Sequence, residues 1–167
     1  MAVRPVVHLP DHVLKRVATP VTDIGPEDKA LAADLMDTML ASPSCVGVAA
    51  PQIGVSIRAF SVDVTGHKKA DSCHGPFVLF NPVLILARHL EVAREGCLSV
   101  PDFTGNVARA TEVVVAGLTP EGSTQVIEAN AFEARALLHE LDHLDGMLFI
   151  DRVGSLSTDV FRRKRYK

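Results

Sequence analysis

Two histidines and a glutamate near the end of the chain lie at a spacing that suits metal chemistry. His139, Glu140 and His143 form an HExxH motif inside residues 132–145, a stretch rich in Ala, Leu and Glu. On a helix, side chains four residues apart share one face with Cβ atoms about 6 Å apart, so both imidazoles can bind one metal ion. Glu140 adjoins the first histidine and can reach a water on that metal. The alternative for the motif alone is a polar helix face with two solvated histidines.

A catalytic metal site also needs a third protein ligand and one open position. The longer HExxHxxGxxH motif is excluded because Phe149 occupies the place of its third histidine, and no Glu or His follows the HExxH motif. Upstream, Cys97 lies in the segment EGCLSVP at 95–101, and a thiolate with two imidazoles suits zinc or iron. Downstream, three aspartates are the competing candidates. These are Asp145, Asp151 and Asp159.

The elements that must hold these residues follow from the hydrophobic spacing. Residues 26–41 begin with a proline at the first helical position and predict an amphipathic helix. Residues 132–145 predict a second helix that ends before Gly146, with Leu137, Leu141 and Leu144 on one stripe. Strands followed by a helix favour an α+β fold, with antiparallel sheets packed around the HExxH helix and an N-terminal helix. We expect residues 1–167 to form a single catalytic domain. The expected strands are 56–64, 77–86, 112–118 and 124–130, with shorter segments at 89–94, 98–101 and 106–109.

The overall composition excludes several classes of function. The 167 residues carry a formal net charge of −3, so we expect neither DNA nor RNA as a main partner. No run of about 18 apolar residues predicts a membrane span. Three cysteines are too few for a disulfide framework and favour a reducing compartment, and we interpret Cys45 and Cys73 as small buried hydrophobic residues. The basic end, Phe161 to Lys167, is typical of a solvated tail, with contact to the ribosome as the alternative.

Three segments resemble the signature motifs of the peptide deformylase family, in that family's order: VGVAAPQIG at 46–54, EGCLSVP at 95–101 and HELDHLDG at 139–146. The resemblance implies a hydrolase that removes the N-formyl group from the N-terminal formyl-methionine of newly synthesised polypeptides and releases formate. It implies one divalent metal ion, Fe²⁺ in preference to Zn²⁺, Ni²⁺ or Co²⁺. It also implies a bacterial-type cytoplasmic protein, with an organellar matrix as the alternative if a transit peptide has been removed.

The same resemblance implies catalytic roles for particular residues. A metal-bound water would attack the formyl carbon, with Glu140 as the general base and later the general acid. The side-chain amide of Gln52 and the backbone N–H of Leu98 would stabilise the developing oxyanion together with the metal. The implied metal ligands are Cys97, His139 and His143.

The resemblance also implies how the peptide binds. The formylated chain would lie as an added strand against the backbone near Val46, Gly47 and Gly96. We expect the absent Cβ of Gly47 to let the substrate come close. The first side chain, normally methionine, would enter an apolar pocket formed by Val46, Phe132 and Ala136.

Two other functions remain in competition, namely an HExxH metallopeptidase that cleaves internal amide bonds and an inactive metal-binding homologue. The chain departs from the family's usual residues at Cys45, Leu138 and Asp102, which bears on specificity more than on activity. Glu95 is a second candidate base, but we favour a structural pairing with Arg109 because the HExxH geometry places Glu140 better.

Overall fold

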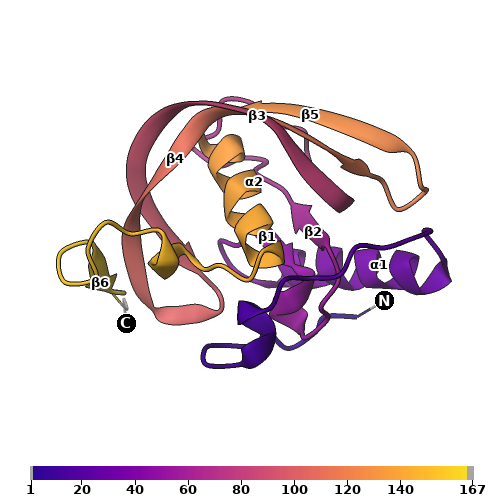
Figure 1. Cartoon of the computed structure of the whole chain (residues 1–167), viewed down its shortest axis with the longest axis horizontal. Helices are drawn as coiled ribbons and strands as arrows, with labels where there is room; N and C mark the ends of the chain where they lie inside the picture. The colour runs from indigo at the N-terminus through magenta and orange to yellow at the C-terminus, as the bar shows by residue number, and fades with distance from the viewer. Residues whose placement is uncertain (1, 165–167) are drawn as a thin grey trace.

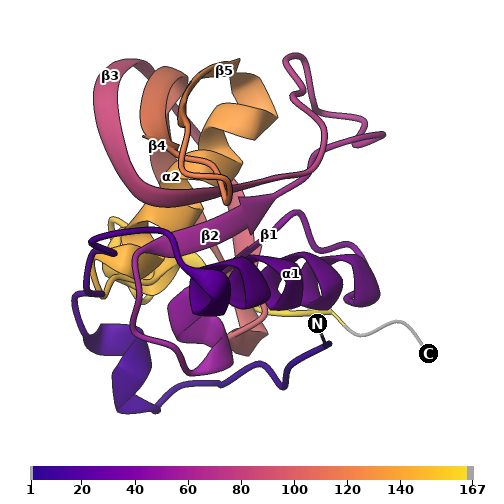
Figure 2. The ribbon, with the colours of Figure 1, turned by 90° about the vertical axis from the view of Figure 1, so that its right-hand side faces the viewer.

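The structure, a computed structural model, describes residues 2–164. Six strands form one sheet in the order β1-β2-β3-β4-β5, with β6 paired to β4, and every pairing between these strands is antiparallel. The sheet curves around helix α2 (Ala131–Leu144), while helix α1 (Pro26–Ala41) packs against β1 and β2 (Figures 1 and 2). The expected α+β class, with strands packed around the HExxH helix, is confirmed.

Helix α1 has the bounds that the sequence predicts. Pro26 occupies its first turn, and the N–H of Gly25 donates to the Asp28 carboxylate at 2.9 Å, which anchors the start. Leu35 and Met39 are buried on one face of the helix. This face covers the sheet at β1 and β2 and so fixes the strand that leads into the candidate site.

Strand β2 (Ala59–Val62) lies between the two helices, and all four of its residues are buried. Phe60 and Val62 belong to the core around α2. Ala59 belongs to the core around α1, and the Ser61 hydroxyl donates to the Leu35 carbonyl of α1 at 3.2 Å. Successive strand residues face opposite sides, so a strand covered on both faces is mostly apolar instead of alternating, and its one polar side chain, Ser61, is hydrogen-bonded.

The prediction of several short β segments between residues 77 and 118 is wrong. The structure joins them into two long strands, β3 (Phe77–Cys97) and β4 (Val100–Leu118). Their pairing shifts register between Phe80 and Val83, between Leu84 and Leu86, and between Gly96 and Cys97. Such bulges bend a strand and increase its twist, which lets one hairpin wrap α2. Residues 87 and 88, where the prediction separates two strands, lie within β3.

The remaining elements are short. β1 (Gly47–Ala49) runs directly into the 3₁₀ helix η2 (Ala50–Ile53), where the sequence predicts an irregular strand or loop. β5 (Thr124–Asn130) forms the expected hairpin with the end of β4 and leads into α2. Two further 3₁₀ helices, η1 (His12–Lys15) and η3 (Phe149–Asp151), flank the lower end of α2, and β6 (Val160–Arg162) closes the described chain.

Helix α2 is the centre of the core. Leu137, Leu141 and Leu144 are buried on the predicted stripe. Gly146 follows with a φ of 73°, and a Cβ there would lie 2.7 Å from the Lys15 carbonyl oxygen, so the helix end and η1 can meet only at a glycine. Among the described residues, no helix is long and apolar enough to cross a membrane.

Candidate metal centre and active site

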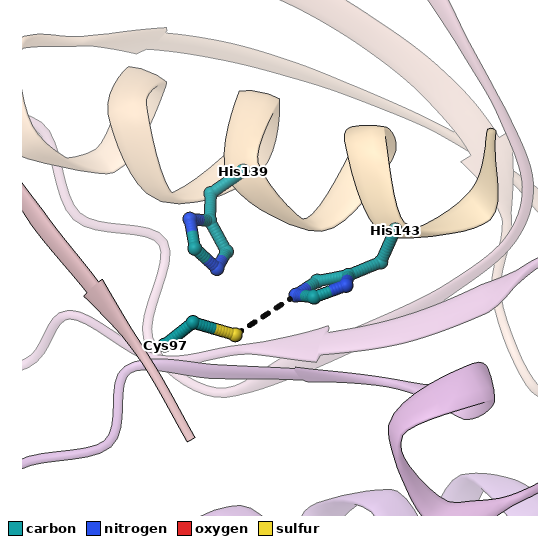
Figure 3. Close-up of side chains that lie close together, drawn as sticks. All are labelled: Cys97, His139 and His143. Carbon is teal, nitrogen blue, oxygen red and sulfur yellow. Dashed lines mark hydrogen bonds between the residues drawn. The ribbon is translucent and has the colours of Figure 1, made fainter. Parts of the chain in front are cut away.

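The three side chains expected to bind a metal lie together between β3 and α2. Cys97 ends β3, and His139 and His143 project toward it from α2 (Figure 3). Their ligand atoms all lie within 4.8 Å of one another. The Cys97 Sγ–His143 Nε2 distance is 3.4 Å, near the edge of about 3.5 Å that the usual bond lengths give a tetrahedral zinc site. The donor set therefore fits one divalent cation.

The three downstream aspartates are engaged elsewhere. Asp145 pairs with Arg58 at 3.0 Å, and Asp151 pairs with the lysine of η1. Asp159 accepts a hydrogen bond from the backbone N–H four residues earlier, at 2.9 Å. Of the candidates that the sequence left open, the structure brings only Cys97 to the histidine pair.

Glu95 is the centre of a buried network behind the histidines. Its carboxylate accepts hydrogen bonds from Arg109 at 2.8 and 3.0 Å and from Arg135 at 2.7 Å. The His139 Nδ1 atom lies 2.9 Å from the same carboxylate, which leaves Nε2 of that ring for the metal. Burial opposes the charge on Glu95, but the donors from Arg109 and His139 hold its pKa well below the ordinary value. The structural pairing with Arg109 is confirmed.

Arg135, to which the sequence assigned no role, ties α2 to the long hairpin. Besides Glu95, its guanidinium donates to the carbonyl oxygens of Val107 at 2.9 Å and Glu91 at 2.7 Å. Arg109 extends the network in the other direction, to Asp142 on α2. Two buried arginines, Arg135 from α2 and Arg109 from β4, therefore join the histidine-bearing part of the helix to the hairpin.

Glu140 lies beside the metal ligands in a closed position. Its side chain is only 3% exposed, and its Oε2 atom has no partner among the described residues. Burial raises the pKa of Glu140 to about 7, with the Glu95 and Asp142 charges adding to the rise. A carboxyl group with that pKa can both accept and donate a proton near neutral pH.

The reason for a glycine at position 47 differs from the one expected. A Cβ on Gly47 would lie 2.6 Å from Oε1 of Glu140. The space beside Gly47 is thus filled by the Glu140 carboxylate, not kept for an approaching peptide. Gly47 makes room for the candidate base.

The two imidazoles have opposite proton affinities. Burial lowers the pKa of His143, and the His139 charge lowers it further, so this ring is neutral and suited to bind a metal. Burial also acts to lower the pKa of His139, but the contacts with Cys97 and Glu95 outweigh it and raise the value well above normal. A cation bound at the cluster would take the place of that proton.

The amide of Gln52 is held at the same centre by η2. Its Oε1 accepts from the Ala49 N–H at 2.9 Å, which fixes the orientation of the amide. Its Nε2 then lies 3.2 Å from the Ser99 hydroxyl and 3.4 Å from Cys97 Sγ. The side-chain amide therefore points its N–H₂ group toward Cys97 and Ser99, and Leu98 lines the same cavity.

A cavity of about 250 Å³ opens beside these groups. Its apolar lining includes Val46, Phe132 and Ala136, as expected. Pockets for drug-sized ligands begin at roughly 300 Å³, so this one suits a single side chain and the group next to it. The ring of His67 stacks on Phe132 with centroids 3.8 Å apart and supports the pocket wall from outside.

The loop that carries His67 is fixed to α2 by a buried carboxylate that the sequence did not indicate. Glu133 accepts from the Ser72 hydroxyl at 2.8 Å and from the His74 backbone N–H at 2.7 Å. The His74 ring also contacts it at 2.7 Å. No local pattern reveals these contacts, because they join residues about 60 positions apart.

Comparison with known proteins agrees with this geometry. The family model for polypeptide deformylase matches residues 3–159. The chain belongs to the polypeptide deformylase family. Among curated deformylases, that of Desulfitobacterium hafniense is 41% identical over 157 residues, which cover 94% of this chain and 99% of the relative.

Solved deformylase structures share the fold. The structure from Legionella pneumophila gives a TM-score of 0.84 at 37% identity and covers 93% of this chain and 88% of its own. The Acinetobacter baumannii deformylase, solved with Met-Ala-Ser bound, gives a TM-score of 0.83 at 34% identity and covers 91% of this chain and 100% of its own.

The departures from the usual deformylase residues lie around the site and leave its centre unchanged. Cys45 lines the cavity, donates to the Gly47 carbonyl at 3.2 Å, and has a pKa that burial raises to about 12, so it is a neutral thiol. Leu138 packs half-buried against the core around α2. The expectation that Cys45 and Cys73 are both buried is wrong: Cys45 is half-buried and Cys73 is exposed on the loop before β3.

Proposed function

We propose that this deformylase-family chain removes the N-formyl group from the N-terminal formyl-methionine of newly synthesised polypeptides and releases formate. The observation that carries the proposal is the convergence of one cysteine sulfur and two imidazoles beside Glu140, at the end of a cavity sized for one side chain. The Met-Ala-Ser bound to the Acinetobacter baumannii relative supports a substrate that begins with methionine.

We propose Cys97, His139 and His143 as the ligands of one divalent metal ion, with Fe²⁺ as the physiological metal. The ligand set would also accept Zn²⁺, Ni²⁺ or Co²⁺. When bound, such a cation supplies Lewis acidity, which lowers the pKa of a nearby water and polarises a carbonyl group. Glu95 would keep the His139 ring oriented toward the ligand position through the 2.9 Å contact with Nδ1.

We propose that Glu140 moves the protons of the reaction. Its pKa of about 7 and its unpartnered Oε2 atom suit a group that takes a proton from the attacking water. The same carboxyl group would then deliver that proton to the departing amine, since a base that has gained a proton is the acid needed in the second half of the reaction.

We propose that the Gln52 amide and the Leu98 backbone N–H bind the oxygen on which negative charge develops. The Ala49 N–H holds the Gln52 carbonyl oxygen at 2.9 Å, so the amide N–H groups are directed before the substrate arrives. A donor of this kind is typically worth about 3 kcal/mol of activation free energy.

The peptide would bind in extended form. β1 is a terminal strand of the sheet, and within residues 2–164 no strand other than β2 pairs with it, so an extended peptide could add to its other edge. With the backbone near Val46, Gly47 and Gly96, the first side chain would enter the apolar part of the cavity at Phe132 and Ala136. This placement brings the formyl group toward Glu140.

The deciding experiment is turnover of formyl-Met-Ala-Ser by anaerobically prepared, metal-analysed protein, with release of formate as the readout. Glu140→Ala should keep the metal and lose activity by roughly 10²–10⁴-fold, because Glu140 is not a ligand. Cleavage of unblocked casein without deformylation would establish the peptidase instead. One equivalent of bound metal without any turnover would establish an inactive homologue.

Two finer proposals concern the metal and the setting. Iron-loaded enzyme should lose activity in air while the nickel form persists, because a thiolate and a ferrous ion are both open to oxidation; equal air stability would argue against Fe²⁺.

We place the enzyme in the bacterial cytoplasm, in line with its bacterial relatives. A ribosome contact through the basic end, whose residues 165–167 lie outside the described part, stays a prediction that cosedimentation with ribosomes would test.

A further inference from the structure

The C-terminal strand carries an arginine to the mouth of the cavity. β6 pairs with β4 at residues 103–105, and the next residue, Arg163, donates its backbone N–H to the Asp102 carbonyl at 2.8 Å. The Arg163 guanidinium lies against Gly96, where any Cβ would overlap it, and it forms part of the cavity lining. The segment through Arg163 is thereby bonded to β4, and the guanidinium lies beside the β3 residue that precedes the proposed metal ligand Cys97.

The guanidinium of Arg163 has no hydrogen-bond or ion-pair partner among residues 2–164. Its Nε atom is buried without a hydrogen bond, and no ion pair joins this side chain to any other residue between 2 and 164. A guanidinium is always charged and has five N–H donors. A buried N–H donor without an acceptor is unfavourable, so the Nε–H group of Arg163 would gain from an acceptor bound beside it.

Arg94 is a second cation on the same rim. Its guanidinium carbon lies 3.7 Å from the Phe161 ring centroid, and the acceptors that it reaches in the described part of the chain are neutral, Asn106 at 3.1 Å and Thr104 at 3.3 Å. The two carboxylates that line the cavity, Glu95 and Glu140, are buried at its base, and Glu95 is committed to other donors. The rim therefore carries two positive charges that the cavity itself does not neutralise.

We infer that Arg163 and Arg94 form an anion subsite that binds a carboxylate side chain of the peptide downstream of its first residue. The inference rests on the proposed function. A peptide with its formyl group at Glu140 and its first side chain in the apolar part of the cavity must leave past Gly96. Each extended residue advances about 3.3 Å, so the second to fourth residues pass the rim, where a guanidinium can bind a carboxylate in bidentate form.

The test uses metal-loaded enzyme and C-terminally amidated formyl-Met peptides with a single Glu or Gln at the second, third or fourth residue. Amidation removes the terminal carboxylate, so only the side chain can supply the anion. We expect kcat/KM to favour Glu over Gln by about threefold to tenfold at one of these positions, the range between an exposed ion pair and a charge-assisted hydrogen bond. Added salt should reduce the preference.

Three variants assign the preference to its residue. Arg163→Gln should bring the Glu/Gln ratio close to one, and Arg163→Lys should restore part of it because the charge remains. Arg162→Gln is the matched control: it removes the neighbouring charge from β6, at a side chain that is exposed and outside the cavity lining. It should keep the full preference. Circular dichroism and thermal unfolding establish that each variant is folded.

The possible results distinguish failure of the anion subsite from failure of the proposed deformylase function. A wild type without a Glu preference at any position overturns the subsite. So does a preference that survives Arg163→Gln, or an Arg163→Gln variant that loses activity equally on Glu and Gln peptides, which would make Arg163 purely structural. Absence of turnover on every formylated peptide would overturn the proposed function itself, and with it the subsite.

Discussion

Removing the charge of Glu95 should destabilise the whole domain and loosen the metal site. The Glu95→Gln substitution keeps the size of the side chain but replaces one acceptor oxygen by an N–H₂ group. In the native network, that carboxylate receives two hydrogen bonds from Arg109 and one from Arg135, and it contacts His139 Nδ1. The new amide would point its donors at a buried guanidinium.

The magnitude follows from burial. The side chains of Glu95 and Arg109 are each only 5% exposed, and that of Arg135 is 10% exposed, so water cannot replace the lost charge. Breaking a buried ion pair by removing one partner costs about 3–5 kcal/mol. For a chain of this size, each kcal/mol lowers Tm by about 2–4 °C, so we expect a fall of roughly 6–20 °C. Metal affinity should fall by about 10- to 100-fold through loss of the His139 orientation.

The assay is urea unfolding of metal-free wild type and variant, followed by metal content after dialysis against a mild chelator. Glu112→Gln is the control, because Glu112 is 49% exposed and its contact with Arg88 is 3.7 Å long; this change should cost at most about 1 kcal/mol. If Glu95→Gln loses less than about 1 kcal/mol and keeps its metal, Glu95 is not the centre of the network.

Three further experiments, each built on a substitution at the site, test the assigned roles. Gly47→Ala should keep metal and fold but lower kcat about 10²-fold, because its Cβ would displace a Glu140 oxygen only 2.6 Å away. Gly25→Ala is the control and should be nearly neutral, because the nearest atom to its Cβ is 3.8 Å away. A normal kcat in Gly47→Ala would contradict the clash. Gln52→Ala should lower kcat by roughly 10²-fold with less change in KM, and a pure KM effect would make Gln52 a binding residue only. Cys97→Ala should lose metal on dialysis while Asp145→Asn, Asp151→Asn and Asp159→Asn retain it, measured as metal per chain, and the reverse pattern would refute the ligand assignment.

Helices were predicted well because their information is local. Residues 26–41 have a proline at the start and apolar residues at helical spacing, and the structure gives the same bounds. The second helix was placed within one residue at each end, and its buried leucine stripe was also predicted. A helix closes its hydrogen bonds between residues four apart, so the signal lies inside the segment itself.

The long hairpin was predicted less well, because strand pairing is non-local. The prediction carried a strand through Pro82 to residue 86 and began a separate one at His89, whereas the structure continues β3 through both positions as one bent strand. Pro is tolerated in strands at bulges, and Pro82 lies within the register shift between Phe80 and Val83. Only the tertiary structure, in which the sheet curves around α2, shows that β3 bends in this region without ending.

The sequence by itself determined that two imidazoles and a carboxylate share one helical turn, since the i, i+4 spacing is enough to place them. Composition and spacing left Cys97 and the aspartates open as the third ligand, and only the family likeness chose between them. Tertiary structure decided the rest: it brings Cys97 to a histidine 46 residues away, gives Gly47 its role beside Glu140, and carries Arg163 to the cavity. These contacts depend on how the sheet curves around the helix, and no local pattern in the chain encodes contacts between residues so far apart in sequence.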